Sequence, residues 1–170
     1  MMLGHIPVAY FTTYYVMKKN NLLWQWQWLA LGIFSAVLPD LDFFYQIFTN
    51  ELYLSHRYLI THLPFFYLIA LVILIIISCF YRKKWFKYAI IIVFVNIFVH
   101  LLVDTMFYGI RWLWPFSKDL IGVYNINGSG GIIVANYFHH WYWYLEIFLW
   151  PIAIIHLISA NKKRFKQSNK

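Results

Sequence analysis

Residues 64–81 read PFFYLIALVILIIISCFY, a run without a charged side chain. A helix needs about 17–25 mostly apolar residues to cross the hydrocarbon core of a bilayer, so this run is long enough to span a membrane. Three more stretches have a similar length and character, namely residues 22–38, 88–107 and 141–160. Gln25 and Gln27 interrupt the first of these, and a shorter apolar stretch, residues 6–17, predicts a short N-terminal helix.

The composition of the whole chain agrees with a membrane protein. Hydrophobic residues make up 62% of the 170 residues and charged residues only 12%, and the mean hydropathy is +0.60. A soluble domain typically carries about 25% charged residues. We therefore predict an all-α integral membrane protein, a bundle of four long helices and one short N-terminal helix in a single domain over residues 1–170. The one cysteine, Cys79, excludes a disulfide framework.

The formal net charge of +8 comes from basic residues that flank the apolar stretches. Eleven of the fourteen gather in three places, at Lys18 and Lys19, between residues 82 and 87, and in the tail from Lys162 onward, and the other three are Arg57, Arg111 and Lys118. Membrane proteins concentrate Lys and Arg in their cytoplasmic loops. This pattern predicts a multi-pass protein of the cell membrane with a cytoplasmic C-terminus, and it argues against nucleic acid as a partner.

In this topology the acidic residues and nearly all histidines fall at or near the other side of the membrane. They are Asp40, Asp42, Glu51, Asp104, Asp119 and Glu146, with His5, His56, His62, His100, His139 and His140. Of the seven histidines only His156 lies toward the cytoplasm. The rule that sets the topology counts only Lys and Arg, so this separation is an independent observation.

A metal site on that side would explain the separation. His100 and Asp104 are four residues apart, so on a helix they share one face with Cβ atoms about 5–6 Å apart. They can hold one ion, or Asp104 can bridge two. Imidazole and carboxylate together suit zinc and similar ions. An ionisable group near the centre of a membrane helix costs about 2.5–3.5 kcal/mol, which a bound cation would offset.

Each element also has a purely structural interpretation. Asp40 and Asp42 can cap a following helix, because Asp is a good N-cap. His56, Arg57 and His62 can be loop residues at the level of the lipid headgroups, and His100 can form a structural hydrogen bond with Asp104. The convergence of all these groups on one side favours a metal site.

Several short motifs occur in order along the chain, namely Gly4-His5, Leu38-Pro39-Asp40-Leu41-Asp42, His56-Arg57, Thr61-His62, His100-Leu101-Leu102-Val103-Asp104 and Trp114-Pro115-Phe116-Ser117. This ordered set resembles the LexA-regulated, membrane-bound, metal-dependent hydrolase family (YdjM-like). The resemblance implies a hydrolase of the bacterial inner membrane. It runs from about residue 4 to residue 117.

A more distant likeness is to zinc-dependent phospholipase C and related single-strand nucleases. Those helical enzymes order their ligands as His, Asp, His and His-x-x-x-Asp. The likeness implies one or two zinc or manganese ions, with metal ligands drawn from His5, Asp40, His56, His62, His100 and Asp104. The nuclease-like enzymes add a His-x-x-x-Glu pair, whereas here Tyr142 stands at that spacing before Glu146. A third metal ion is therefore not expected.

The implied mechanism is hydrolysis by a metal-activated water. One of Asp40 and Asp42 would be a ligand, and the other, here Asp42, a candidate general base. Glu146 is an alternative base, and Arg57 can pair with a phosphate through its planar guanidinium group. The membrane setting suggests membrane lipid as a partner and a lipid or lipid-linked phosphoester as substrate, at the extracytoplasmic interface.

Two rival functions stay open at this point. The buried polar groups can conduct protons or metal ions, as such groups do in transporters, or the chain can be a scaffold with a structural metal. A conduit needs polar groups through the full depth of the membrane. Residues 68–77 and 89–95 are almost wholly apolar, which argues against the conduit.

Overall fold

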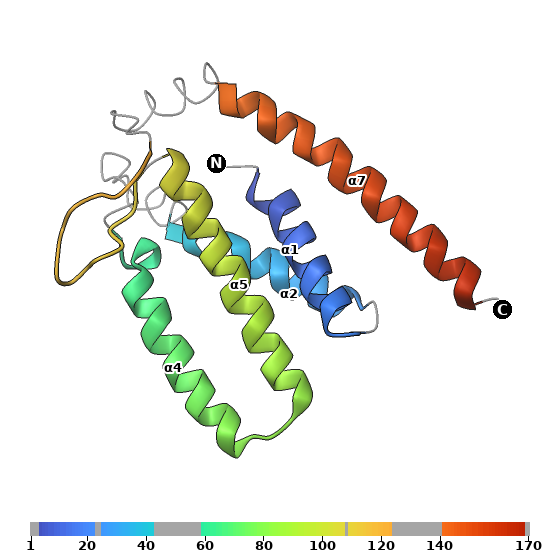
Figure 1. Ribbon diagram of the computed structural model, residues 1–170, viewed down its shortest axis with the longest axis horizontal. Coiled ribbons are helices and arrows are strands. Elements are labelled where there is room, and N and C mark those ends of the chain that lie inside the picture. The colour runs from blue at the N-terminus through green and yellow to red at the C-terminus, as the bar shows by residue number, and fades with distance from the viewer. Residues whose placement is uncertain (1–3, 23–24, 43–58, 108, 124–140, 169–170) are drawn as a thin grey trace.

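The computed structural model describes residues 4–22, 25–42, 59–107, 109–123 and 141–168. Within these ranges the chain is helical and forms no strand, apart from one isolated antiparallel bridge between Ile110 and Ile121. The helices are α1 (His5–Lys19), α2 (Trp26–Val37), α4 (Pro64–Phe80), α5 (Lys84–Phe107) and α7 (Trp141–Ser168), with 3-10 turns at Leu38–Asp40 and Ile60–His62 (Figure 1). The predicted all-α fold and the short N-terminal helix are confirmed for the described part of the chain.

The prediction of four long membrane-spanning helices is wrong. In the described ranges only two helices are long and apolar enough to cross a membrane, Lys84–Met106 within α5 and Trp143–Lys162 within α7. The apolar helix α4 has 17 residues and α2 only 12. The stretch 22–38 does not form one long helix because Gln25 is extended, and the chain tightens into a 3-10 turn with Pro39 in its first positions.

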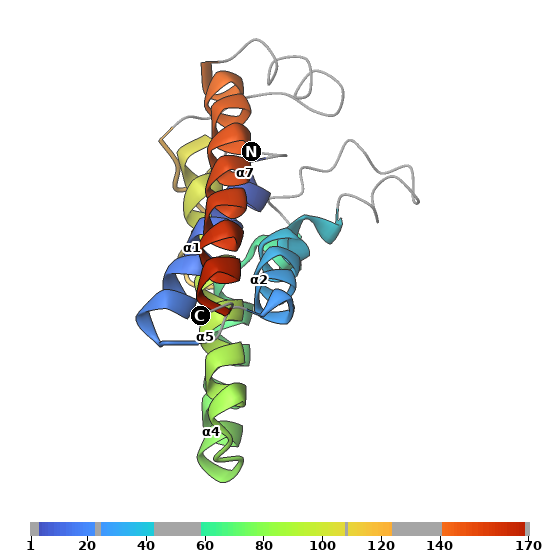
Figure 2. The same ribbon diagram turned by 90° about the vertical axis from the view of Figure 1, so that its right-hand side faces the viewer.

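The centre of the bundle is formed by α1, α2 and α5, which pack against one another. Figures 1 and 2 show α4 alongside α5 and α7 crossing beside α1. The spanning stretch of α5 is 39% buried, whereas that of α7 is 11% buried and α4 has no buried residue. So much exposed apolar surface is unusual on a water-soluble monomer and is typical of a surface that faces lipid.

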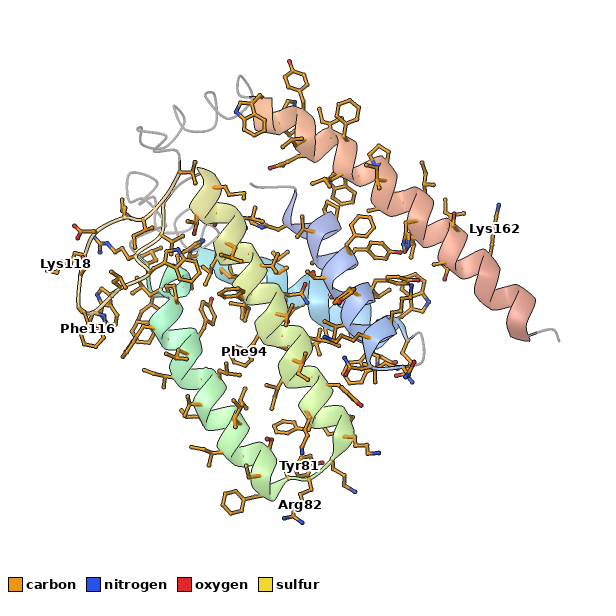
Figure 3. All side chains as sticks on the ribbon, viewed as in Figure 1. Tyr81, Arg82, Phe94, Phe116, Lys118 and Lys162 are labelled. Carbon is orange, nitrogen blue, oxygen red and sulfur yellow. The ribbon has the colours of Figure 1, made fainter. Side chains whose placement is uncertain are left out.

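An apolar groove of about 900 Å³ lies between α4 and α5. Phe94 is one of its lining residues, and Figure 3 shows this side chain between the two helices. At one end of the groove Trp114 stacks on Phe66, with ring centroids 5.2 Å apart. The segment after α5, described over residues 109–123, therefore packs against the beginning of α4.

That segment also folds back on the end of α5. Ile110 and Ile121 exchange two backbone hydrogen bonds of 2.9 Å, and the indole Nε1 of Trp112 donates to Thr105 Oγ1 at 2.8 Å. Gly109 has a φ of 66°, a conformation that favours glycine. These contacts cover the last turns of α5, next to Asp104.

A buried polar contact joins α1 to α5. The side-chain amide of Asn96 donates to Thr13 Oγ1 at 3.0 Å and to the Ile92 carbonyl at 2.8 Å, and it accepts from Thr12 Oγ1 at 2.8 Å. Hydrogen bonds between polar side chains and small residues at crossings are the usual means by which membrane helices associate. Here Gly32 supplies the small residue, because α2 passes directly over Thr13.

Replacing Gly32 with alanine is expected to destabilise the bundle. The new Cβ would lie 1.9 Å from Thr13 Oγ1 and 3.1 Å from Asn96 Nδ2, and Thr13 is fully buried. Overpacking of this kind costs about 1–3 kcal/mol, so the thermal unfolding midpoint in detergent should fall. Ala30→Ser, at an exposed position of α2, is the control and should leave the midpoint unchanged. An unchanged midpoint for Gly32→Ala would contradict this close crossing.

Candidate metal centre

Five ionisable side chains converge at one end of the bundle. The beginning of α1, the 3-10 turn after α2, the 3-10 turn before α4 and the C-terminal half of α5 meet there (Figure 1). These elements contribute His5, Asp40, His62, His100 and Asp104, which we call the His/Asp cluster. Local sequence explains the placement of two of them. Pro39 sets the turn that carries Asp40, and Pro64 starts α4 directly after the turn that carries His62.

The donor atoms of the cluster lie close together. One ligand atom each from His5, Asp40, His100 and Asp104 lies within 4.8 Å of all the others. The Nε2 atom of His62 is 3.5 Å from Asp40 Oδ1 and 3.5 Å from Asp104 Oδ2. The Asp40 side chain is 25% exposed, whereas the other four residues are buried. Asp40 therefore lies where the cluster opens to its surroundings, and the cluster could hold a metal ion.

The tautomer of His100 is fixed by its backbone partner. Its Nδ1 lies 2.6 Å from the carbonyl oxygen of Ala36, and a carbonyl can only accept, so Nδ1 carries a hydrogen. In the neutral ring, Nε2 then presents a lone pair. This atom lies 3.3 Å from Asp104 Oδ2 and 3.7 Å from Asp40 Oδ1, and it is buried without a hydrogen-bond partner in the described part of the chain. A neutral imidazole nitrogen and two carboxylate oxygens all accept hydrogen bonds, so a proton or a cation must lie between them.

His62 is oriented by a carboxylate in the same manner. Its Nδ1 lies 3.0 Å from Asp42 Oδ2, and Thr61 Oγ1 donates to the same oxygen. The hydroxyl of Tyr67 donates in turn to the Thr61 carbonyl at 2.7 Å. Histidines that bind metals usually donate their other ring N–H to a carboxylate or a carbonyl. Both His62 and His100 have such a partner on the side away from the cluster.

The charges of the cluster shift the pKa values of His62 and Asp40. Burial alone would lower the pKa of His62, but contacts with Asp104, Asp40 and Asp42 outweigh burial and raise that pKa well above its usual value. Burial would raise the pKa of Asp40, but His62 and His100 hold it below the usual value. The carboxylates thus stabilise positive charge at the centre, which is what a bound cation would supply.

Other predicted site residues lie elsewhere or are not described. Glu146 is buried on α7 and is not among the residues of the cluster, so its role as a base stays a prediction. His56 and Arg57 lie outside the described residues, as do His139 and His140. His156 lies on α7, where its Nδ1 is 2.7 Å from the hydroxyl of Tyr10, outside the cluster.

Sequence reasoning missed two contributors to this centre. The carbonyl of Ala36 orients His100, and Tyr67 holds the backbone that carries Thr61. A backbone oxygen has no sequence signature, so Ala36 could not have been found. Thr61 precedes His62 in the motif that carried the resemblance, and its position there was the one available hint.

Comparison with known proteins places the chain in a family. The sequence profile described as YdjM inner membrane protein matches residues 1–166. Searches of curated proteins and of solved structures found no match. The profile confirms the YdjM-like resemblance and, with the two candidate spans, a membrane location. It does not include the hydrolase activity or the likeness to phospholipase C, which stay predictions. The chain belongs to the YdjM inner membrane protein family.

Proposed function

We propose that this protein is a membrane-embedded, metal-dependent hydrolase whose His/Asp cluster binds zinc or manganese. The observation that carries the proposal is His100 Nε2, which is buried without a hydrogen-bond partner in the described part of the chain and lies 3.3 Å from Asp104 Oδ2 and 3.7 Å from Asp40 Oδ1. A donor set of imidazoles and carboxylates suits zinc. The partly exposed side chain of Asp40 supports access for water and substrate.

The residues would divide the chemistry among them. His5, His62 and His100 with Asp40 and Asp104 would hold the metal, which when bound lowers the pKa of a coordinated water and polarises the scissile group. Asp42 and Thr61 keep the His62 ring turned toward the cluster, and the Ala36 carbonyl does the same for His100. The position of Asp42 behind His62 supports an orienting role more than the predicted role of general base.

The placement of charge supports one side of the membrane for the cluster. His5 begins α1 and Lys18 and Lys19 end it, while α5 begins at Lys84 and carries Asp104 near its end. Figure 3 shows Arg82 at the turn that joins α4 to α5. The basic ends and the cluster thus lie at opposite ends of these helices. With the basic ends in the cytoplasm, the cluster faces the extracytoplasmic interface, where a lipid or a lipid-linked phosphoester is the expected substrate.

Reporter fusions would test this topology. A cytoplasmic reporter fused after Lys170 should be active, and an exported reporter inserted in the loop at 125–131, which lies outside the described residues, should be active as well. The reason is that the spanning stretch of α7 separates the two positions. A reporter in the turn after Arg82 serves as the control and should agree with the C-terminal fusion. A cytoplasmic loop at 125–131 would place the cluster in the other compartment.

The function itself is tested by metal analysis joined to an activity screen. Protein purified in mild detergent should retain zinc or manganese and hydrolyse generic phosphoesters or phospholipids. A metal-loaded protein that hydrolyses none of these compounds, yet carries protons or metal ions across vesicles, would overturn the hydrolase in favour of a conduit. Bound metal without turnover or flux would leave only the structural role of a scaffold.

A further inference from the structure

The two oxygens of each cluster carboxylate face different histidines. In Asp104, Oδ1 lies 3.2 Å from His5 Nε2, whereas Oδ2 lies 3.3 Å from His100 Nε2 and 3.5 Å from His62 Nε2. In Asp40, the atom nearest to His5 Nε2 is Oδ2 at 3.9 Å, whereas Oδ1 lies 3.5 Å from His62 and 3.7 Å from His100. In both carboxylates, therefore, one oxygen faces His5 and the other faces His62 and His100.

These separations suit atoms that share an ion. Zinc binds nitrogen and oxygen at about 2.0–2.2 Å, and in a tetrahedral arrangement two such donors lie about 3.3–3.6 Å apart. The pairs of Asp40 and Asp104 with the three histidines fall in or close to this range, from 3.2 to 3.9 Å. Each carboxylate can thus serve an ion on either side.

The rings of His5 and His100 cannot share one ion. They are stacked, with centroids 3.8 Å apart and planes inclined by only 21°. A metal bound by histidine lies in the ring plane along the nitrogen lone pair, at about 2.0–2.1 Å. Two nearly parallel planes at this spacing do not meet within that distance of both nitrogens. The four donor atoms are close enough for a single ion, but the ring orientation lets that ion bind only one of the two histidines.

We propose that the His/Asp cluster holds two divalent cations, with Asp40 and Asp104 bridging them. One position has four protein donors, His62 Nε2, His100 Nε2, Asp40 Oδ1 and Asp104 Oδ2. The other has three, His5 Nε2, Asp40 Oδ2 and Asp104 Oδ1. Closed four-donor sites are typical of firmly held zinc, and three-donor sites leave a place for water or substrate. Two ions about 3.5–4 Å apart are a recurrent arrangement in enzymes that cleave phosphoesters.

The number of ions also determines the class of substrate. The three carboxylates at and behind the cluster, Asp40, Asp42 and Asp104, outweigh a single dication, so a one-ion centre would repel an anion. Two dications outweigh the three carboxylates and leave net positive charge at the open position beside His5. This inference rests on the proposed metal binding, and it favours an anionic substrate, such as a phosphoester, for the proposed hydrolase.

Manganese alone is a sufficient probe. Metal-free protein titrated with Mn²⁺ should bind two ions per chain, and its electron paramagnetic resonance spectrum should show exchange coupling between the two bridged ions. His5→Ala should bind one ion per chain and give the uncoupled spectrum of an isolated Mn²⁺, because the four-donor position remains. His5→Gln, which keeps more of the side-chain volume, should behave in the same way. His156→Ala is the matched control and should keep two coupled ions.

A wild-type protein that saturates at one Mn²⁺, or that shows two uncoupled ions, would overturn the inference. So would a coupled pair that persists in both His5 variants. These readouts do not depend on turnover. Two coupled ions without any hydrolysis would contradict the proposed function but support the two-ion centre. One ion with full hydrolysis would support the proposed function but contradict the two-ion centre.

Discussion

Asp104→Ala is expected to empty the His/Asp cluster of metal and to abolish hydrolysis. Asp104 lies within 3.5 Å of all three cluster histidines, through Oδ1 for His5 and through Oδ2 for His62 and His100. As a bridge it would serve both ions, so its loss should weaken both positions. Loss of metal assistance removes several kcal/mol of transition-state stabilisation, which corresponds to about 10³-fold or more in rate.

The variant should still insert and fold. Removing a buried carboxylate from a membrane helix relieves an insertion cost of about 2.5–3.5 kcal/mol, so circular dichroism should remain that of the wild type. Asp119→Ala is the matched control, because Asp119 is exposed and accepts a hydrogen bond from Ser117 outside the cluster. Metal content measured by mass spectrometry and rates on a generic phosphoester check both variants. Wild-type metal content in Asp104→Ala would refute the assignment of Asp104 as a metal ligand.

Asp40→Asn and Asp42→Asn are expected to differ sharply although the two residues are neighbours in sequence. Asp40 faces His62, His100 and His5 within 4 Å, so a neutral carboxamide there should lose metal and activity together. Asp42 touches the cluster through the far nitrogen of His62. Loss of such an orienting carboxylate typically weakens metal affinity about 10–100-fold, and excess metal should then restore most of the rate.

Titrating metal into each purified variant separates these outcomes. A rate for Asp42→Asn that stays about 10²–10⁴-fold low at saturating metal would instead identify Asp42 as the general base. Equal loss of metal in both variants would make both aspartates ligands. Asp119→Asn carries the same chemical change at an exposed position and should titrate like the wild type.

The sequence was sufficient for the parts of this centre that lie within one helix. The spacing of His100 and Asp104 predicted their shared face, and the one-sided gathering of His and Asp predicted a common location. The positions of Asp40 and Asp42 relative to His62 were not predictable. It depends on the 3-10 turn after Pro39, which turns one carboxylate into the cluster and the other behind His62.

The number of membrane-spanning helices was overestimated for a related reason. Hydropathy reports how apolar a stretch is, but it does not report where the backbone leaves the helix. In residues 22–38 the extended Gln25 and the turn at Pro39 shorten α2 to 12 residues. In α4 the helix ends at Phe80, ahead of the basic turn with Arg82. Such ends are set by turns and tertiary packing.

The short helix α2 has a consequence for the surrounding lipid. Its 12 residues rise only about 18 Å at 1.5 Å per residue, whereas a bilayer has a hydrocarbon layer about 30 Å thick. If α2 lies along the bilayer normal with its exposed Trp26 and Phe34 against lipid, the acyl chains beside it would shorten or tilt, a hydrophobic mismatch that costs a fraction of a kcal/mol per Å. A thinner hydrocarbon layer there would bring water closer to Asp40, which follows α2 in the chain, and bilayers of longer or shorter lipids would then change the access of water to the His/Asp cluster.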